Sequence, residues 1–81
     1  MVERTNAEID KEWGERAKRL LQAEMKRRGI NVAQLAEKLS ALGVVENERN
    51  VANKISRGGF TAAFFLQCLK VMSVSNLALD V

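Results

Sequence analysis

Hydrophobic residues recur at helical spacing through the first third of the chain. They are Trp13, Ala17, Leu20, Leu21 and Met25. Because residues three or four positions apart share one face of a helix, this pattern predicts a helix from near Ile9 to Gly29. The rest of its surface is rich in charged residues, most of which we expect to face solvent. We therefore expect a flexible N-terminus over residues 1–8 and a single domain over residues 9–81.

Two shorter helices are predicted next, each preceded by an asparagine that can cap it. Asn31 precedes a second stripe of helical spacing, which stops before Gly43. This stripe consists of Val32, Leu35, Ala36, Leu39 and Leu42. Asn47 precedes a helix from Glu48 to about Arg57, which the following pair of glycines ends. The inward positions of this third helix are Val51, Ala52 and Ile55.

A fourth and strongly apolar helix is predicted after Thr61, whose side chain can cap it. Phe60 and Phe65 have the spacing of a hydrophobic staple around this cap. The inward positions expected after the staple are Leu66, Leu69 and Met72. Residues 76–81 suit either a short fifth helix capped by Ser75 or an extended segment, because so short a stretch has little periodicity.

The composition places these helices in one small domain and excludes several kinds of chemistry. The chain has 81 residues, 47% of them hydrophobic, and it has no proline, which favours an all-α fold. One cysteine and no histidine leave no internal disulfide, no Cys/His zinc site and no Cys–His nucleophile. We therefore expect neither an enzyme nor a bound metal or cofactor.

Charge is distributed unevenly along the chain. The formal net charge is +3, but residues 16–70 hold eleven basic and four acidic side chains, a net charge of +7. This central part would attract an anionic partner. The charged N-terminus is unlike a secretory signal, and no apolar run is long enough to span a membrane. These features predict a cytoplasmic protein without a membrane partner.

The third helix carries the candidate chemistry. Its outward positions include Arg49, Asn50, Asn53, Lys54 and Arg57. Arginine can donate two hydrogen bonds to guanine, and asparagine can pair with adenine, so these side chains suit base edges in the major groove. We expect Arg49, Asn50, Asn53 and Lys54 to contact bases. We expect phosphate contacts from Arg57, Lys26 and Arg28 and from the backbone at Gly58.

Residues 17–79 resemble the repressor and Cro-like, or lambda repressor-like, class of helix-turn-helix domains. The matching positions are Ala36, Ala52, Ile55 and Gly58, together with the segment FLQCLKVMSVSNLAL. The resemblance implies a compact all-α fold of four to five helices in which the second and third form the DNA-binding unit. Ser40 stands where that class has its turn glycine, and the stretch 40–47 is longer, so we expect a lengthened turn between these helices.

A second resemblance links the segment RNVANKISRGGFTAAFFLQCL to a family of short, uncharacterised proteobacterial proteins. Together these features predict a small bacterial transcriptional regulator that binds double-stranded DNA sequence-specifically through residues 48–57. A homodimer is expected, because repressor-like proteins commonly place two recognition helices one DNA turn apart. The candidate dimer residues are Phe64, Cys68, Leu77 and Leu79. Trp13 is interpreted as a core or interface residue.

The alternative is a helical protein-interaction module, such as an adaptor or an antitoxin-like partner, with no direct reading of DNA. Two features favour it. Glu46 and Glu48 stand near the start of the third helix, where their charges would repel phosphates. The C-terminal stretch is also apolar enough to dock another protein.

Overall fold

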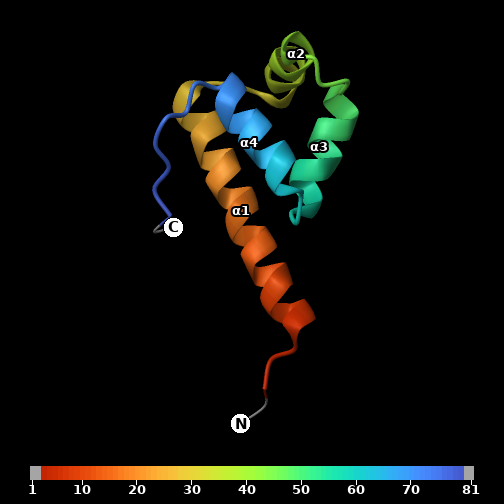
Figure 1. Ribbon diagram of the computed structural model, residues 1–81, viewed down its shortest axis with the longest axis vertical. Helices are drawn as coiled ribbons and strands as arrows, with labels where there is room; N and C mark the ends of the chain where they lie inside the picture. Colours follow the sequence, from red (N-terminus) through yellow and green to blue (C-terminus); the bar gives the residue numbers. More distant parts are fainter. Residues whose placement is uncertain (1–2, 80–81) are drawn as a thin grey trace.

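The computed structural model describes residues 3–79, and this part of the chain is all-α (Figure 1). It contains α1 (Asn6–Arg28), α2 (Val32–Leu42), α3 (Glu48–Arg57) and α4 (Ala62–Val71), and no strand occurs between residues 3 and 79. The prediction of an all-α protein is confirmed. None of these helices is long and apolar enough to cross a membrane.

The predicted caps form at the starts of α2, α3 and α4. The side chains of Asn31 and Asn47 each accept a hydrogen bond of 2.8 Å from the backbone N–H three residues later. Thr61 accepts one of 3.1 Å from the N–H of Phe64. Each cap satisfies a backbone donor that the first turn of a helix would otherwise leave without a partner. The local sequence therefore predicts where these three helices begin.

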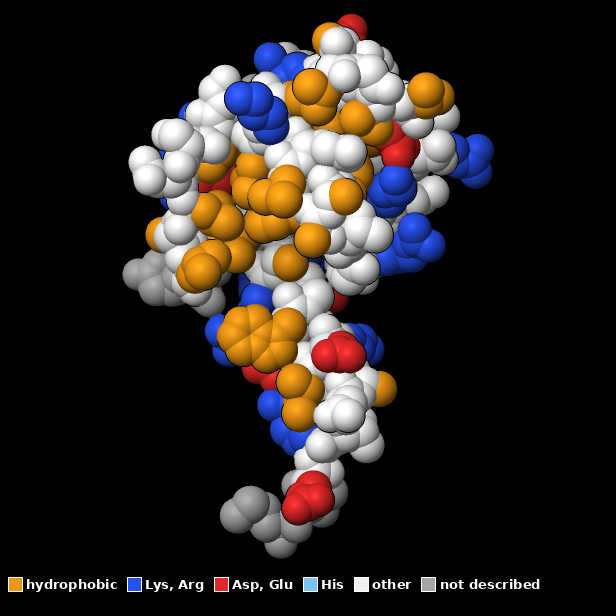
Figure 2. All heavy atoms as spheres, in the orientation of Figure 1, with side chains coloured by type: hydrophobic (Ala, Val, Ile, Leu, Met, Phe, Trp, Pro, Cys, Tyr) orange, Lys and Arg blue, Asp and Glu red, His pale blue; other side chains and the backbone are white. Residues whose placement is uncertain are grey.

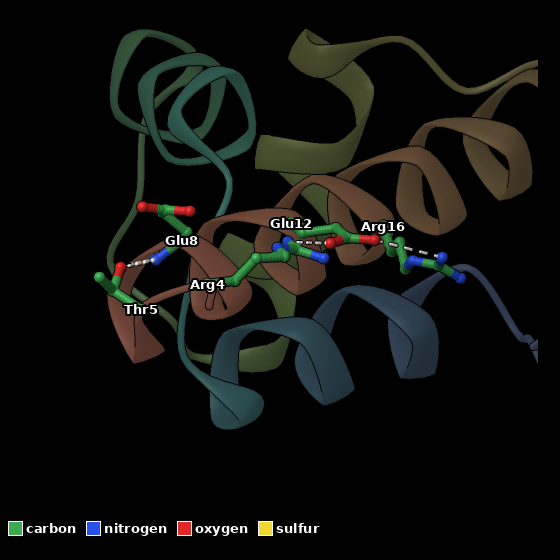
Figure 3. Close-up of polar contacts among 5 residues, drawn as sticks. All are labelled: Arg4, Thr5, Glu8, Glu12 and Arg16. Atoms are coloured by element: carbon green, nitrogen blue, oxygen red, sulfur yellow. Dashed lines mark hydrogen bonds and ion pairs between the residues drawn. The ribbon is translucent and has the colours of Figure 1, made fainter. Parts of the chain in front are cut away.

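α1 begins earlier than the hydrophobic pattern predicts, at Asn6 rather than near Ile9. Thr5 caps it by accepting a hydrogen bond of 3.1 Å from the N–H of Glu8 (Figure 3). Residues 6–8 of the expected flexible N-terminus are thus helical, and residues 1 and 2 lie outside the described part. The pattern missed this turn because it contributes no residue to the core.

One hydrophobic core joins the four helices. α2 packs against α3 and α4, and the last turns of α1 close one side. The buried hydrophobic residues are Leu21, Met25, Leu35, Ala36, Leu39, Val51, Ile55, Phe64, Cys68, Leu69 and Met72. The inward positions predicted for the middle of α2 and for Val51 and Ile55 of α3 are thus confirmed. The Phe60–Phe65 staple also forms, with ring centroids 5.7 Å apart.

The buried face of α4 differs from the predicted one. Leu66 was expected inside and is 63% exposed, whereas Phe64 is 4% exposed and Cys68 is fully buried. Because nearly every residue of α4 is apolar, its sequence does not select a face. Contact with α2 and with the side chains of α3 selects it instead.

No fifth helix forms between α4 and residue 79. The chain turns at Ser73, which has φ 61°, and the N–H of Val74 donates a hydrogen bond of 2.9 Å to the carbonyl of Leu69. The segment then runs back beside α1 (Figure 1), and Leu77 packs partly buried against the core. Of the two alternatives for the C-terminus, the non-helical one is observed as far as residue 79.

α1 extends well beyond the other helices. It has 23 residues, so it is about 35 Å long at 1.5 Å per residue. In Figure 1 the first turns of α1 stand clear of the rest, and the molecule measures 49 × 24 × 18 Å. The buried residues of α1 begin at Leu21. The C-terminal end of α1 therefore belongs to the core, whereas its first turns contribute no buried residue.

Candidate nucleic-acid interface

α3 packs on the core with one side and is exposed to solvent on the other. Val51 and Ile55 are 0% and 4% exposed, and they fix the inner side of the helix against the core. The outer side is solvent-exposed at Glu48, Arg49, Asn50, Asn53, Ser56 and Arg57. The predicted bounds of this helix are confirmed by the structure. A rigid helix with a polar outer face is a suitable element for insertion into a groove.

Part of this outer face forms a shallow hollow. It is lined by Asn50, Asn53, Lys54, Ser56 and Arg57. Two amide groups, a hydroxyl and a guanidinium therefore lie next to one another within about two turns of helix. The amides and the hydroxyl can both donate and accept hydrogen bonds, and the guanidinium donates them, as the edges of bases require. Arg49 and Arg57 form no ion pair with any of residues 3–79, so both charges remain available to a partner.

Lys54 is placed differently from its predicted role. Its ammonium forms an ion pair with Glu46 and lies 4.9 Å from the centroid of the Phe64 ring. These contacts tie α3 to the α2–α3 connection and to α4. The sequence could not show them, because one partner is eight residues away and the other belongs to another helix.

Glu46 is correspondingly less repulsive to phosphates than its charge predicts. Its side chain is only 8% exposed, and Lys54 balances its carboxylate. The hydroxyl of Ser40 donates a hydrogen bond of 3.3 Å to the backbone carbonyl of Glu46, which links the end of α2 to the connection. Glu48, in contrast, is exposed in the first turn of α3.

The predicted phosphate contacts do not all gather beside α3. Lys26 and Arg28 lie in the last turn of α1, which Figure 1 places on the other side of α4 from α3. Arg28 also lies 3.5 Å from Glu24. A basic residue that the sequence did not single out, Lys18, reaches α3 instead and donates a hydrogen bond of 3.0 Å to the carbonyl of Ser56.

Gly58 makes a close backbone approach, but toward α1. It has φ 66°, and a β-carbon at this position would lie 3.0 Å from the carbonyl oxygen of Gly14. A β-carbon at Gly14 would lie 2.9 Å from the nitrogen of Gly59. Glycines on both segments thus let α1 cross the end of α3, whereas the phosphate contact expected at Gly58 stays a prediction. The sequence alone could not show the role of Gly14, because its contacts with Gly58 and Gly59 depend on how α1 crosses the end of α3.

Two of the four predicted dimer residues are not at the surface. Phe64 and Cys68 belong to the core, so the prediction that they form an exposed strip is wrong. Burial is also the main reason that the pKa of the Cys68 thiol is raised to about 12. Leu77 is half-buried, and Leu79 is 73% exposed. The other large exposed hydrophobic side chains are Ile9, Trp13, Leu42, Val45 and Leu66.

Within residues 3–79, no three acidic or cysteine side chains come together as metal ligands. No curated protein and no solved structure matches the chain. A family described as "Domain of unknown function (DUF6471)" matches residues 13–77. The match runs from the middle of α1 through α2, α3 and α4 to the segment that follows them. The chain therefore belongs to the DUF6471 family.

Proposed function

We propose that this protein is a small bacterial transcriptional regulator that binds double-stranded DNA by placing α3 in the major groove. The observation that carries the proposal is the polar outer face of α3, with Arg49, Asn50, Asn53 and Arg57 exposed above a buried Val51 and Ile55. Asparagine favours helices less than lysine or glutamine does, so two exposed asparagines in so short a helix favour a functional surface over a merely solvated one.

Each exposed side chain has a role suited to its chemistry. Arg49 can donate two hydrogen bonds to guanine, and Asn50 and Asn53 can each pair with adenine. Arg57, in the last turn of α3, is suited to a phosphate. Lys54 supports the helix through Glu46 and Phe64 in this proposal and does not read bases.

The arrangement of the helices supports a helix-turn-helix of the lambda repressor-like kind as part of this proposal. α2 and α3 pack on each other, residues 43–47 connect them, and α1 and α4 support them. In Figure 2, basic side chains gather on the side of the molecule where Figure 1 shows α3. A positive surface would increase the rate at which the protein meets DNA.

The first test is fluorescence anisotropy with random-sequence duplex DNA across a salt series. A phosphate-binding protein loses affinity linearly on a log–log plot, because binding releases counterions. A selection experiment then identifies the preferred site. Asn53→Ala is expected to cost about 1 to 3 kcal/mol of discrimination at one base position. Asn76→Ala is the matched control, since Asn76 is exposed and lies outside α3.

Two results would contradict the proposal: no binding at low salt, or an unchanged sequence preference in Asn53→Ala.

The second candidate function is a protein-interaction module of the adaptor or antitoxin-like kind. It is favoured by the exposure of Trp13, Leu66 and Leu79, which are 60%, 63% and 73% exposed. Absence of DNA binding at every salt concentration would favour this candidate.

A further inference from the structure

We propose that the apolar stripe along the first two-thirds of α1 binds a second copy of this chain, with the two α1 helices packed antiparallel. The proposal does not depend on DNA binding, because self-association can be measured without DNA. This surface replaces the predicted dimer surface that included Phe64 and Cys68, because both side chains are buried in the core.

The stripe consists of Ile9, Trp13, Ala17 and Leu20. Ile9 is 37% exposed and Trp13 is 60% exposed. Trp13 also lines a surface hollow of about 270 Å³, together with Arg16, Ala17, Leu20 and Leu79. Figure 2 shows apolar side chains along this part of α1 and over the neighbouring α4 and C-terminal segment. Monomeric proteins rarely leave a continuous apolar surface of this kind uncovered.

The charges of α1 identify the occupant as a second copy. Residues 6–15 carry Glu8, Asp10, Glu12, Glu15 and one lysine, for a net charge of −3. Residues 16–23 carry Arg16, Lys18 and Arg19 and no acidic side chain, for a net charge of +3. An antiparallel pair lays the acidic half of each helix on the basic half of the other. A parallel pair would place like charges together, which is unfavourable.

The spacing of the stripe gives a register for this pairing. Three residues of the stripe, Ile9, Trp13 and Leu20, and the neighbouring Arg16 follow one another at intervals of four, three and four residues, as in the seam of a coiled coil. Antiparallel helices can then place Ile9 opposite Leu20 of the second copy and Trp13 opposite Arg16 of the second copy. Each contact occurs twice, so the interface is symmetric and closed.

The contacts within one chain already orient the side chains for this register. The guanidinium of Arg16 lies 4.7 Å from the centroid of the Trp13 ring. Glu12 pairs with Arg4 and, at 3.5 Å, with Arg16, so it holds this guanidinium beside the stripe (Figure 3). A cation–π contact between the copies therefore needs little rearrangement. In Figure 2 the apolar side chains along α1 lie apart from the side of the molecule where Figure 1 shows α3, so this pairing leaves α3 free.

The first experiment measures self-association of the full chain by analytical ultracentrifugation and by the fluorescence of Trp13, the only tryptophan. We expect a concentration-dependent dimer whose emission shifts to shorter wavelength as the indole leaves water. Trp13→Ala is expected to weaken the dimer about 100-fold or more, because the lost side chain occurs twice at the centre of the interface. Leu42→Ala, a change at an exposed leucine on α2, is the matched control and should leave the dimer unchanged.

The second experiment exchanges charges and needs no apolar truncation. In this register Glu12 of one copy lies beside Arg19 of the other, and this contact occurs twice. Glu12→Lys and Arg19→Glu are each expected to weaken self-association about tenfold, because each replaces these two contacts with like-charge contacts. Mixing the two variants should restore a mixed dimer of wild-type affinity. Circular dichroism verifies that each variant folds.

Three outcomes would overturn the proposal. The first is a wild-type protein that stays monomeric at about 100 µM, well above the Kd of a micromolar interface, which would assign the stripe to a partner of another kind. The second is a dimer whose affinity Trp13→Ala leaves unchanged. The third is a mixture of Glu12→Lys and Arg19→Glu that associates no better than either variant alone. None of these results bears on the salt dependence of DNA binding, so failure of the two proposals can be distinguished.

Discussion

α1 places a glutamate between two arginines at two points along its length, and the two sites have different surroundings. Glu24 lies 2.8 Å from Arg27 and 3.5 Å from Arg28, and its side chain is 4% exposed. Glu12 lies between Arg4 and Arg16, and its side chain is 37% exposed. The first site belongs to the packed end of α1, and the second belongs to the end that stands outside the core.

The comparison teaches that surroundings decide what a contact contributes. An exposed ion pair competes with water and salt, whereas a buried carboxylate depends on the partners that the fold provides. The apolar residues of α1 divide in the same way, since Leu21 is fully buried and Trp13 is 60% exposed. One amphipathic helix therefore supplies core residues at its C-terminal end and leaves apolar residues exposed nearer its N-terminus.

The largest expected effect separates the apolar residues of the two ends. Leu21→Ala should lower the free energy of unfolding by about 2 to 5 kcal/mol, because it leaves a cavity in the core. Trp13→Ala, measured in dilute protein, should change it far less. Urea denaturation of both variants gives the comparison. Equal losses would show that both ends of α1 are packed to the same degree.

The next effect tests the contact between α1 and the glycines that follow α3. Gly14→Ala should lower the free energy of unfolding by about 2 kcal/mol, because the new methyl group collides with the backbone of Gly59. The sign is diagnostic, since glycine to alanine within a helix is otherwise stabilising by about 1 kcal/mol. Gln22→Ala, an exposed change on the same helix, is the control. A more stable Gly14→Ala protein would rule out the crossing of α1 and α3.

A smaller effect is expected at the buried carboxylate. Glu24→Ala should lower the free energy of unfolding by about 1.5 kcal/mol, through the loss of the charge-assisted hydrogen bond from Arg27 and of the ion pair with Arg28. Glu12→Ala is the matched variant, and we expect it to leave the unfolding temperature of the dilute protein unchanged. Thermal unfolding followed by circular dichroism distinguishes the two. A larger loss in Glu12→Ala would reverse the comparison.

The smallest effect concerns the titration of Glu12. A hydrogen bond and the charge of Arg4, with a smaller contribution from Arg16, lower the pKa of Glu12 below its ordinary value of 4.5. A lowered folded-state pKa stabilises the protein above the unfolded-state pKa, and this contribution is lost as the pH falls through the folded-state pKa. Because the group is exposed, NMR titration of its carboxyl carbon is the suitable measurement. Arg4→Ala should raise the midpoint toward 4.5.

Much of the fold could be predicted from local sequence. The caps Asn31, Asn47 and Thr61 were predicted from their side chains and were observed at the starts of α2, α3 and α4. The core face of α2 was predicted because its apolar residues recur at helical spacing, with polar residues on the opposite side. The face of α4 was not, because its apolar residues surround the helix and only its neighbours select the buried side.

The candidate site was predicted in part. Exposure of Arg49, Asn50, Asn53 and Arg57 was predicted by helical periodicity and is observed. The engagement of Lys54 was not predicted, because Glu46 and Phe64 reach it only once the connection and α4 are in place. The separation of Lys26 and Arg28 from α3 likewise depends on how the long α1 is placed against the other helices.

The sequence by itself therefore determined the helices, three of their caps and the polar outer face of α3. These features depend on backbone hydrogen bonds and side-chain periodicity among residues at most four positions apart. Only the tertiary structure decided that Phe64 and Cys68 are buried, that Gly14 meets Gly58, and that Ile9 and Trp13 of the α1 stripe remain exposed. The physical reason is that these contacts join residues far apart in the chain, whose distances are set by the packing of whole helices.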